Sequence, residues 1–216
     1  MLSEIVQSIQ IAINEVSVMT GWEAVAVILA IAYLILAMKT NIWCWAAAFA
    51  STAIYTVLFW NVSLLMESVL NVYYMAMAIY GFWLWRYSAD SRHQTELPII
   101  SWSLNKHLVI IAVTSCVSLI VGYLMATNTS ASFPYLDALT TCFAVMTTYL
   151  VAKKVIENWY YWMVINSLSI YLYLQKGLML TSGLLILYLF MAVSGYFMWR
   201  KKMQQNHAPD DAALAS

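Results

Sequence analysis

Charged side chains are scarce in this sequence of 216 residues. Asp, Glu, Lys and Arg make up 9% of it, hydrophobic residues make up 63%, and the mean hydropathy is +0.75. A soluble domain is about one-quarter charged. The composition therefore excludes an ordinary soluble domain and predicts an all-α integral membrane protein that crosses the bilayer several times. The net charge of zero gives no indication of a nucleic-acid partner, and we expect none.

Motifs for catalysis and for metal binding are missing as well. Cys44, Cys116 and Cys142 all fall in apolar segments, without the paired spacing of a disulfide framework or a zinc site. The three histidines form neither a metal-ligand pattern nor a triad, and the sequence has no ATP-binding phosphate loop. We therefore expect no catalytic residue, no metal and no cofactor, and we predict that the protein is not an enzyme. A membrane-embedded enzyme or assembly subunit, the alternative, would need a cluster of acids or histidines at one membrane face, which the sequence lacks.

Long apolar runs are present in place of these motifs. Seven of them are about long enough to cross ~30 Å of hydrocarbon at ~1.5 Å of helix per residue. The predicted spans are residues 22–38, 42–60, 64–85, 108–125, 138–151, 159–174 and 178–199. A weakly amphipathic stretch at residues 1–21 predicts a short interfacial segment, and the polar residues 203–216 predict a disordered tail.

The basic residues predict the orientation of these spans. With seven spans, nine of the ten Lys and Arg residues fall on one side of the membrane and only Lys176 falls on the other. Cytoplasmic loops carry such an excess of basic residues. The sequence therefore predicts an N-terminus outside the cell and a C-terminus in the cytoplasm.

An internal repeat divides the chain. The third and seventh spans match at an offset of 114 residues, from Tyr74, Met77, Ala78, Gly81, Trp85 and Arg86 to Tyr188, Met191, Ala192, Gly195, Trp199 and Arg200. The second and sixth spans share N-x-x-x-W, which pairs Trp45 with Trp162 at an offset of 117. We predict two parallel three-helix repeats, at 22–86 and 134–202, joined by a linker helix at 108–125. Transporters with parallel repeats bind substrate near the bilayer midplane. A chance match between aromatic-rich spans is the alternative.

The sixth span carries polar residues where a lipid-facing helix would be apolar. Trp162, Asn166, Ser169 and Tyr173 follow the i, i+4, i+7, i+11 spacing and therefore share one helix face. The tryptophan ring can stack on a cation, and the amide can both donate and accept hydrogen bonds. We predict that this face lines a substrate cavity, and we add Trp45 because the repeat matches it to Trp162. The alternative is a helix–helix contact through Asn166, with Trp162 as packing.

Two acids, one within the third predicted span and one at the start of the fifth, are candidates for a specific role. Glu67 is the only acid well inside a span, and Asn71 shares its helix face. Acids inside membranes usually face a bundle interior or an aqueous cavity. We predict that Glu67 and Asn71 contact the substrate; the alternative is that the helix begins later and Glu67 lies at the interface. Asp137 follows Pro134 at the start of the fifth span, where we predict that it caps the helix.

Several of these residues resemble the PnuC family of bacterial vitamin-uptake transporters. The sixth span contains E-N-W-x-x-W-x-x-x-N from Glu157 to Asn166, with K-K shortly before it. P-x-x-D directly precedes the fifth span, and the third span ends with I-Y-G-x-W-x-W. The resemblance covers roughly residues 22–202. It implies a bundle of two three-helix units and a linker helix, related to the SWEET sugar transporters, with Trp162 and Asn166 at positions that contact the substrate.

The resemblance also implies a substrate and partners. Characterised family members take up nicotinamide riboside, an NAD precursor, and relatives take up thiamine or other vitamins. We therefore expect uptake of the riboside across the bacterial inner membrane by facilitated diffusion and alternating access. The resemblance further implies trapping by a cytoplasmic kinase and a homotrimer. Thiamine is the alternative substrate, because many riboside transporters of the family have glutamine where this chain has Glu67. A proton-coupled pump is the alternative mechanism.

Overall fold

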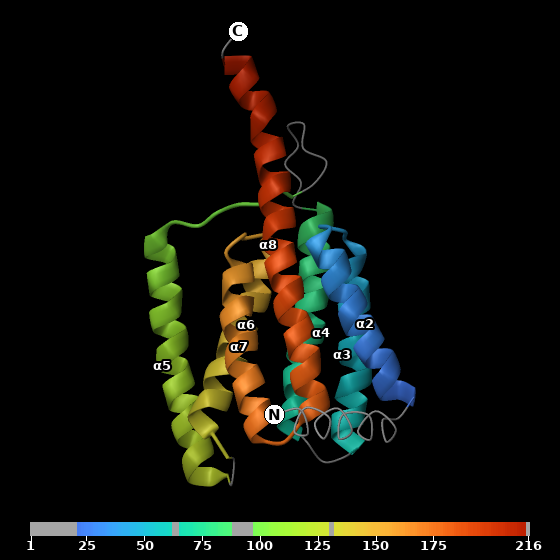
Figure 1. The fold of residues 1–216 in the computed structure, drawn as a ribbon, viewed down its shortest axis with the longest axis vertical. Coiled ribbons are helices and arrows are strands. Elements are labelled where there is room, and N and C mark those ends of the chain that lie inside the picture. The colour runs from blue at the N-terminus through green and yellow to red at the C-terminus, as the bar shows by residue number, and fades with distance from the viewer. Residues whose placement is uncertain (1–20, 62–64, 88–96, 130–131, 215–216) are drawn as a thin grey trace, which may run out of the picture. The chain divides into compact units, whose positions relative to one another are not determined.

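The computed structural model describes residues 21–61, 65–87, 97–129 and 132–214 of the chain (Figure 1). Its helices are α2 (Gly21–Met38), α3 (Trp43–Asn61), α4 (Leu65–Tyr87), α5 (Leu104–Asn128), α6 (Pro134–Ala152), α7 (Asn158–Gln175) and α8 (Met179–Leu214). These helices match the seven predicted spans in order, so the predicted all-α membrane fold is confirmed. The predicted interfacial segment lies outside the described residues, apart from Gly21.

Five helices are long and apolar enough to cross a membrane by length and composition alone. They are α2, α3, α5, α6 and α8, the last over Met179–Gln205. The other two predicted spans, α4 and α7, are more polar: α4 carries Glu67 in its first turn and Arg86 in its last, and α7 carries asparagine and serine within its length. The polar character of α7 comes partly from the residues that were predicted to face a cavity.

The last helix is longer than predicted. We expected disorder from residue 203, but α8 continues as a helix to Leu214 (Figure 1). Met203, Gln204 and Gln205 directly after the span favour a helix, and no glycine follows Gly195 to end it. The structure therefore differs from the predicted disordered tail over residues 203–214.

The chain folds into two compact units. Among the described residues, unit 1 contains Ser103–Thr147 and Tyr160–Ala192. Unit 2 contains Gly21–Trp102, Thr148–Trp159 and the chain from Val193 onward. Unit 1 thus holds α5 and most of α6 and α7, and unit 2 holds α2, α3, α4 and the turn between α6 and α7. The two units also divide α8 between them.

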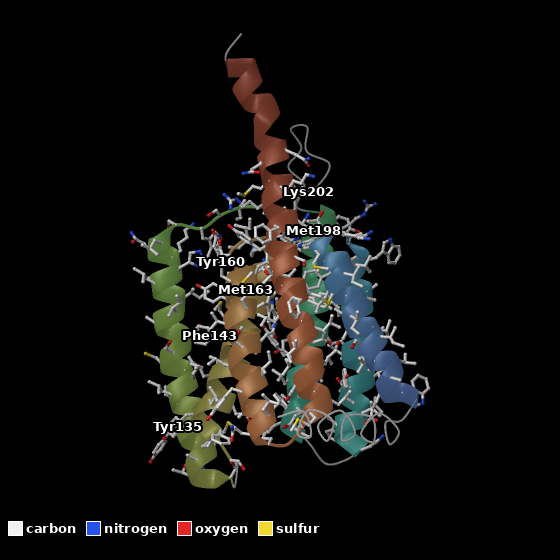
Figure 2. The ribbon with its side chains drawn as sticks, viewed as in Figure 1. Tyr135, Phe143, Tyr160, Met163, Met198 and Lys202 are labelled. Atoms are coloured by element: carbon white, nitrogen blue, oxygen red, sulfur yellow. The ribbon has the colours of Figure 1, made fainter. Side chains whose placement is uncertain are left out.

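In unit 1, α5 packs against α6 and α7. A Cβ added to Gly122 of α5 would lie 2.7 Å from the ring of Tyr135, which is labelled in Figure 2, so α5 approaches the start of α6 closely. Near the other end of α5, His107 Nδ1 lies 2.9 Å from the hydroxyl oxygen of Tyr161 on α7. Phe143 of α6 packs against the same tyrosine, with ring centroids 6.5 Å apart. The linker helix therefore packs with the second repeat.

Unit 2 contains two turns that repeat one another. The α2–α3 turn passes through Thr40 (φ 53°), and the α6–α7 turn passes through Lys154 (φ 50°), 114 residues later. In both turns this residue donates its N–H to the carbonyl three positions back, and the next residue donates to the carbonyl five positions back. These two bonds form the Schellman motif, which ends a helix through a left-handed residue. The first helix of each repeat therefore ends in the same way.

Contacts between tryptophan and glycine recur at the same offset. Trp45 of α3 lies against Gly81 of α4, and Trp159 of α7 lies against Gly195 of α8. In both pairs a Cβ added to the glycine would come within 3.0 Å of the indole, which real Cβ atoms essentially never do. Glycine therefore allows the second and third helices of each repeat to approach closely at this point.

Two further tryptophans complete this cluster in unit 2. The rings of Trp45 and Trp85 meet edge to face, 5.5 Å apart and at 84°, and those of Trp159 and Trp199 do the same at 5.4 Å and 89°. The indole hydrogen bonds of Trp85 and Trp199 follow the same repeat. We call these four residues the tryptophan brace.

The brace joins the two repeats. Trp85, in the last helix of the first repeat, donates its Nε1–H to the carbonyl oxygen of Ala152 at the end of α6, at 2.9 Å. Trp199, in the last helix of the second repeat, donates to the carbonyl oxygen of Ala37 near the end of α2, also at 2.9 Å. Each repeat is thus bonded to the end of the other repeat's first helix.

These contacts correct the predicted pairing of the second and sixth spans. The repeat runs at one offset of 114, so Trp45 corresponds to Trp159 and not to Trp162. The N-x-x-x-W match at 117 required one loop to be three residues longer, whereas the two turns have the same length and the same hydrogen bonds. The match is a coincidence of spacing in two tryptophan-rich helices.

The segment before α5 is attached to the α6–α7 turn, within unit 2. Ile100 forms an isolated parallel bridge with Val155. The N–H of Ile100 donates to the Lys154 carbonyl at 3.0 Å, and the N–H of Ile156 donates to the Ile100 carbonyl at 2.9 Å. The Lys154 ammonium donates to the carbonyl of Leu97 at 2.9 Å. Residues 97–100 are therefore held in place by hydrogen bonds to the α6–α7 turn.

Candidate substrate-binding site

The predicted polar face of α7 is largely buried. Asn166 is 4% exposed and Ser169 is 7% exposed, while Trp162 and Tyr173 on the same face are partly exposed. All four side chains belong to unit 1. A single helix therefore brings an aromatic ring, an amide, a hydroxyl and a phenol together along one line, as their spacing predicts.

Three of these side chains lack hydrogen-bond partners in the described part of the chain. Trp162, Asn166 and Ser169 make no side-chain hydrogen bond to any described residue, although other buried polar groups do. The hydroxyls of Thr147 and Ser182, for example, donate to backbone carbonyls of their own helices at 2.6 and 2.9 Å. A buried polar group without a partner costs free energy, on the order of 1–3 kcal/mol. A bound molecule with donors and acceptors would supply the missing partners.

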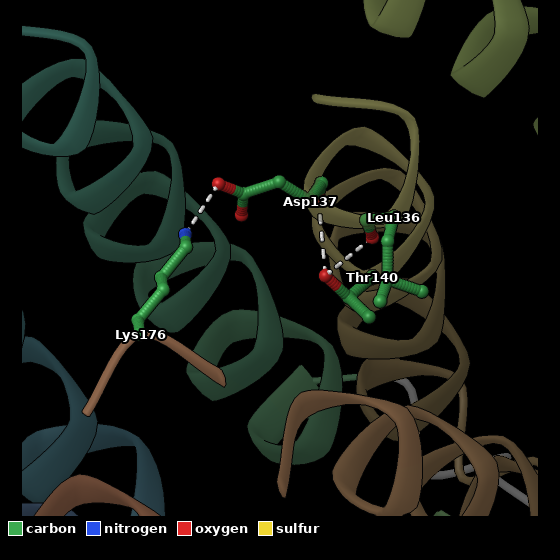
Figure 3. Close-up of polar contacts among 4 residues, drawn as sticks. All are labelled: Leu136, Asp137, Thr140 and Lys176. Atoms are coloured by element: carbon green, nitrogen blue, oxygen red, sulfur yellow. Dashed lines mark hydrogen bonds and ion pairs between the residues drawn. The ribbon is translucent and has the colours of Figure 1, made fainter. Parts of the chain in front are cut away.

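A cation occupies the C-terminal end of this face. The ammonium of Lys176, just beyond α7, lies 5.6 Å from the ring centroid of Tyr173. The same ammonium donates to Oδ2 of Asp137 at 3.0 Å (Figure 3). Sequence reasoning used Lys176 only to orient the protein and so missed this contact. The spacing of Lys176, three residues after Tyr173, was the signal that could have found it.

Asp137 does not cap α6 as predicted. The helix begins at Pro134, which places Asp137 within the first turn and not at the capping position. Its carboxylate pairs with Lys176 instead. The hydroxyl of Thr140 bonds to the carbonyls of Leu136 and Asp137, both at 3.1 Å (Figure 3). A carboxylate in the first turn remains favourable for the helix dipole.

Glu67, Asn71 and Trp45 belong to unit 2. Glu67 lies in the first turn of α4 and its side chain is exposed. Asn71 donates its side-chain amide to the backbone carbonyl of Glu67 at 2.8 Å, so one of its donors is used within α4. Trp45 is 2% exposed and packs in the tryptophan brace.

The turn between α6 and α7 carries strong positive charge. The Lys153 ammonium lies 5.7 Å from the ring centroids of both Tyr80 and Tyr149, which stack 6.4 Å apart. A hydrogen bond with Tyr80 is the main cause that raises the pKa of Lys153 above its ordinary value. Lys153 therefore stays charged at neutral pH, as a cytoplasmic turn requires under the predicted orientation.

Among the described residues, five helices long and apolar enough to cross a membrane, together with a largely buried polar face on α7, indicate a multi-pass membrane transporter. The chain belongs to the nicotinamide mononucleotide transporter family, whose model matches residues 20–201. The sequence is 23% identical over 173 residues to a nicotinamide riboside transporter PnuC of Escherichia coli (strain K12), covering 69% of this chain and 72% of the relative. The PnuC of Shigella flexneri matches equally well.

The fold is similar to a solved structure. A crystal structure described as that of the vitamin B3 transporter PnuC aligns with a TM-score of 0.67 and 21% sequence identity. The alignment covers 85% of this chain and 82% of the other. This likeness supports the seven-helix architecture, and the family match identifies the chain as a transporter and not an enzyme.

Proposed function

We propose that this protein takes up nicotinamide riboside. The observation that carries the proposal is the polar face of α7, on which the buried Asn166 and Ser169 and the partly exposed Trp162 make no side-chain hydrogen bond to a described residue. The named relatives of the chain, which transport this riboside, support it.

The chemistry of the riboside suits this face. It combines a pyridinium cation, a carboxamide and a ribose. The ring of Trp162 can stack on the cation, and the amide of Asn166 can both donate to and accept from the carboxamide. Ser169 and Tyr173 offer hydroxyls to the ribose, and the substrate contacts of Glu67 and Asn71 stay predictions from the sequence. Trp45 has a packing role in this proposal, because it fills the space above Gly81.

The proposed transport runs down the gradient of the riboside across the inner membrane of a bacterium. Alternating access of the two repeats would carry it, and phosphorylation by a cytoplasmic kinase would trap it. A homotrimer and an orientation with the N-terminus outside belong to the same proposal. The excess of basic residues on one side supports the orientation.

Thiamine is a second candidate substrate. It also carries a flat cationic ring, together with an aminopyrimidine and a hydroxyl, so the α7 face would satisfy most of its groups. The exposed carboxylate of Glu67 favours this reading, because it supplies a counter-charge that an amide would not.

Calorimetry on the purified protein separates the two substrates. Nicotinamide riboside and thiamine are each titrated into the wild type and into Glu67→Gln. Riboside binding that survives Glu67→Gln supports the proposal. Thiamine binding that is lost in Glu67→Gln moves the protein to the thiamine alternative. If neither compound binds, the proposed substrate class is wrong.

A further inference from the structure

The position of Lys176 is fixed by the way α7 ends. Gly177 has φ 73°, its N–H donates to the Leu174 carbonyl at 3.1 Å, and the N–H of Leu178 donates to the Tyr173 carbonyl at 3.0 Å. These are again the two bonds of the Schellman motif. The backbone of Lys176 is thus held directly after the helix, while its four-carbon side chain stays flexible.

The Lys176 ammonium has two partners of the kind that bind organic cations. It lies 3.0 Å from Oδ2 of Asp137 and 5.6 Å from the ring centroid of Tyr173. Figure 3 shows the lysine reaching from beyond α7 to the carboxylate on α6. The lysine and aspartate side chains are 26% and 29% exposed, so water and solutes reach both of them. All three residues belong to unit 1.

Tyr173 connects this pair to the proposed substrate site. It shares a helix face with Asn166, from which it is separated by ~10 Å along the axis at ~1.5 Å per residue. Under the proposed orientation it forms the outer end of that face. A substrate that approaches the α7 face from outside would therefore meet Asp137, Lys176 and Tyr173 first.

We propose that Asp137 and Tyr173 form an outer site for a flat organic cation, which Lys176 occupies while no substrate is bound. The inference deepens the proposed function and rests on it, since it requires a cationic substrate. A pyridinium or thiazolium ring can lie against the tyrosine ring and beside the carboxylate, as the ammonium does now. Lys176 then moves to water. This exchange of one cation for another keeps the Asp137 carboxylate paired throughout.

A purely structural ion pair predicts a different result. If Asp137 and Lys176 only tie α6 to α7, the loss of either charge should lower thermal stability by a similar amount and affect substrate affinity in the same direction. If they form an exchangeable cation site, the two losses act in opposite directions. Removing the carboxylate weakens binding, whereas removing the competing ammonium strengthens it.

The test measures affinity for nicotinamide riboside and for thiamine by calorimetry, together with the melting temperature, in the purified full-length protein. We expect Asp137→Asn to weaken binding of the cation about two- to five-fold and Lys176→Gln to strengthen it about two- to five-fold. Tyr173→Leu should weaken binding because the ring is lost, while Tyr173→Phe keeps the ring, loses only the hydroxyl proposed to contact the ribose, and should weaken riboside binding less than Tyr173→Leu does. Lys176→Arg keeps the cation and should also match the wild type.

Glu23→Gln controls for general charge effects. Glu23 is another acid in the first turn of a helix, on α2 in unit 2, and it contributes nothing to the outer site. Its loss should leave the affinity unchanged. If Asp137→Asn and Lys176→Gln change the affinity in the same direction, or leave it unchanged, the outer site is refuted.

The wild-type titrations keep this inference separate from the proposed function. Suppose that the wild type binds the riboside, but Asp137→Asn and Lys176→Gln change the affinity in the same direction or leave it unchanged. In that case only the outer site is wrong. If the wild type binds thiamine and not the riboside, the proposed substrate is wrong, and the variants still test the outer site with thiamine. If the wild type binds neither cation, both proposals are overturned.

Discussion

At the scale of single residues, Asn166 is the most informative side chain for the proposed substrate site. It is 4% exposed and makes no side-chain hydrogen bond to a described residue, so its amide is available to a substrate. We expect Asn166→Ala to weaken substrate binding by roughly 1–3 kcal/mol, since the substrate loses its hydrogen bonds to this amide. Calorimetry with the compound that the wild type binds gives the value.

Ser167 provides the matched control for this change. It is the next residue on α7, it is exposed, and its hydroxyl bonds to the Met163 carbonyl of its own helix at 2.8 Å. Ser167→Ala should bind substrate as the wild type does. An Asn166→Ala variant that folds and binds equally well would show that Asn166 is a packing residue.

Thr40 carries backbone strain that can be measured separately from function. Its φ of 53° is unfavourable for a β-branched residue, by about 1–2 kcal/mol relative to a right-handed conformation. Thr40→Gly should therefore raise stability by about 0.5–1 kcal/mol after the entropy cost of glycine. Because Lys202 donates to the threonine hydroxyl at 2.6 Å, Thr40→Asn is a useful second variant that keeps an oxygen there.

The neighbouring residue controls for the effect of glycine itself. Lys39 precedes Thr40 and does not have a positive φ, so Lys39→Gly adds chain entropy without relieving strain. Its melting temperature should fall while that of Thr40→Gly rises. A fall in both would mean that the left-handed turn is not strained.

The sequence predicts which side chains lie on the same face when all of them belong to one helix. The face of Trp162, Asn166, Ser169 and Tyr173 follows from spacing alone, because helix geometry fixes which residues share a face. The contact between Asp137 and Lys176 could not be predicted in this way. It joins two helices, and its geometry depends on how the turn after α7 is closed.

At the scale of the helices, close packing at glycine holds the last two helices of the second repeat together. The Cβ of Gly195→Ala would collide with the ring of Trp159, which is 1% exposed and has little room to move. We expect this substitution to lower stability by about 1–3 kcal/mol through overpacking. Thermal unfolding in detergent gives the comparison with the wild type.

Gly183 on the same helix distinguishes packing from helix propensity. A Cβ at Gly183 would meet no atom within 4 Å. Gly183→Ala should therefore raise stability by about 0.5–1 kcal/mol, because alanine loses less entropy in a helix. If both alanine variants stabilise the protein, the close approach of α7 and α8 at Gly195 is not a tight contact.

The helices themselves could be predicted because long apolar runs leave few other possibilities in a membrane. The sequence alone does not decide which residues of the first repeat correspond to which residues of the second. The spacing N-x-x-x-W occurs in both repeats, but only the contacts of Trp45 with Gly81 and of Trp159 with Gly195 reveal which tryptophans correspond. A tryptophan-rich helix offers several matches of equal quality in sequence, and packing selects one.

At the scale of the whole molecule, the distribution of charge predicts which end faces the cytoplasm. Nine of ten basic residues lie on one side of the predicted spans, and one of them, Lys154, holds its ammonium 4.4 Å from the ring centroid of Trp85 in the tryptophan brace. Cysteine labelling tests this orientation. In a variant whose three native cysteines are replaced, Gln175→Cys should react with a membrane-impermeant maleimide in intact cells, and Lys201→Cys should react only after permeabilisation.

Gln175 and Lys201 are both exposed, so differences in burial do not explain a difference in labelling. The reverse pattern would place the C-terminus outside and contradict the excess of basic residues in cytoplasmic loops. It would also turn Asp137, Lys176 and Tyr173 toward the cytoplasm, where they would meet the released substrate and not the incoming one. The outer cation site therefore depends on this orientation, and the labelling experiment tests which side of the membrane the site faces before any transport is measured.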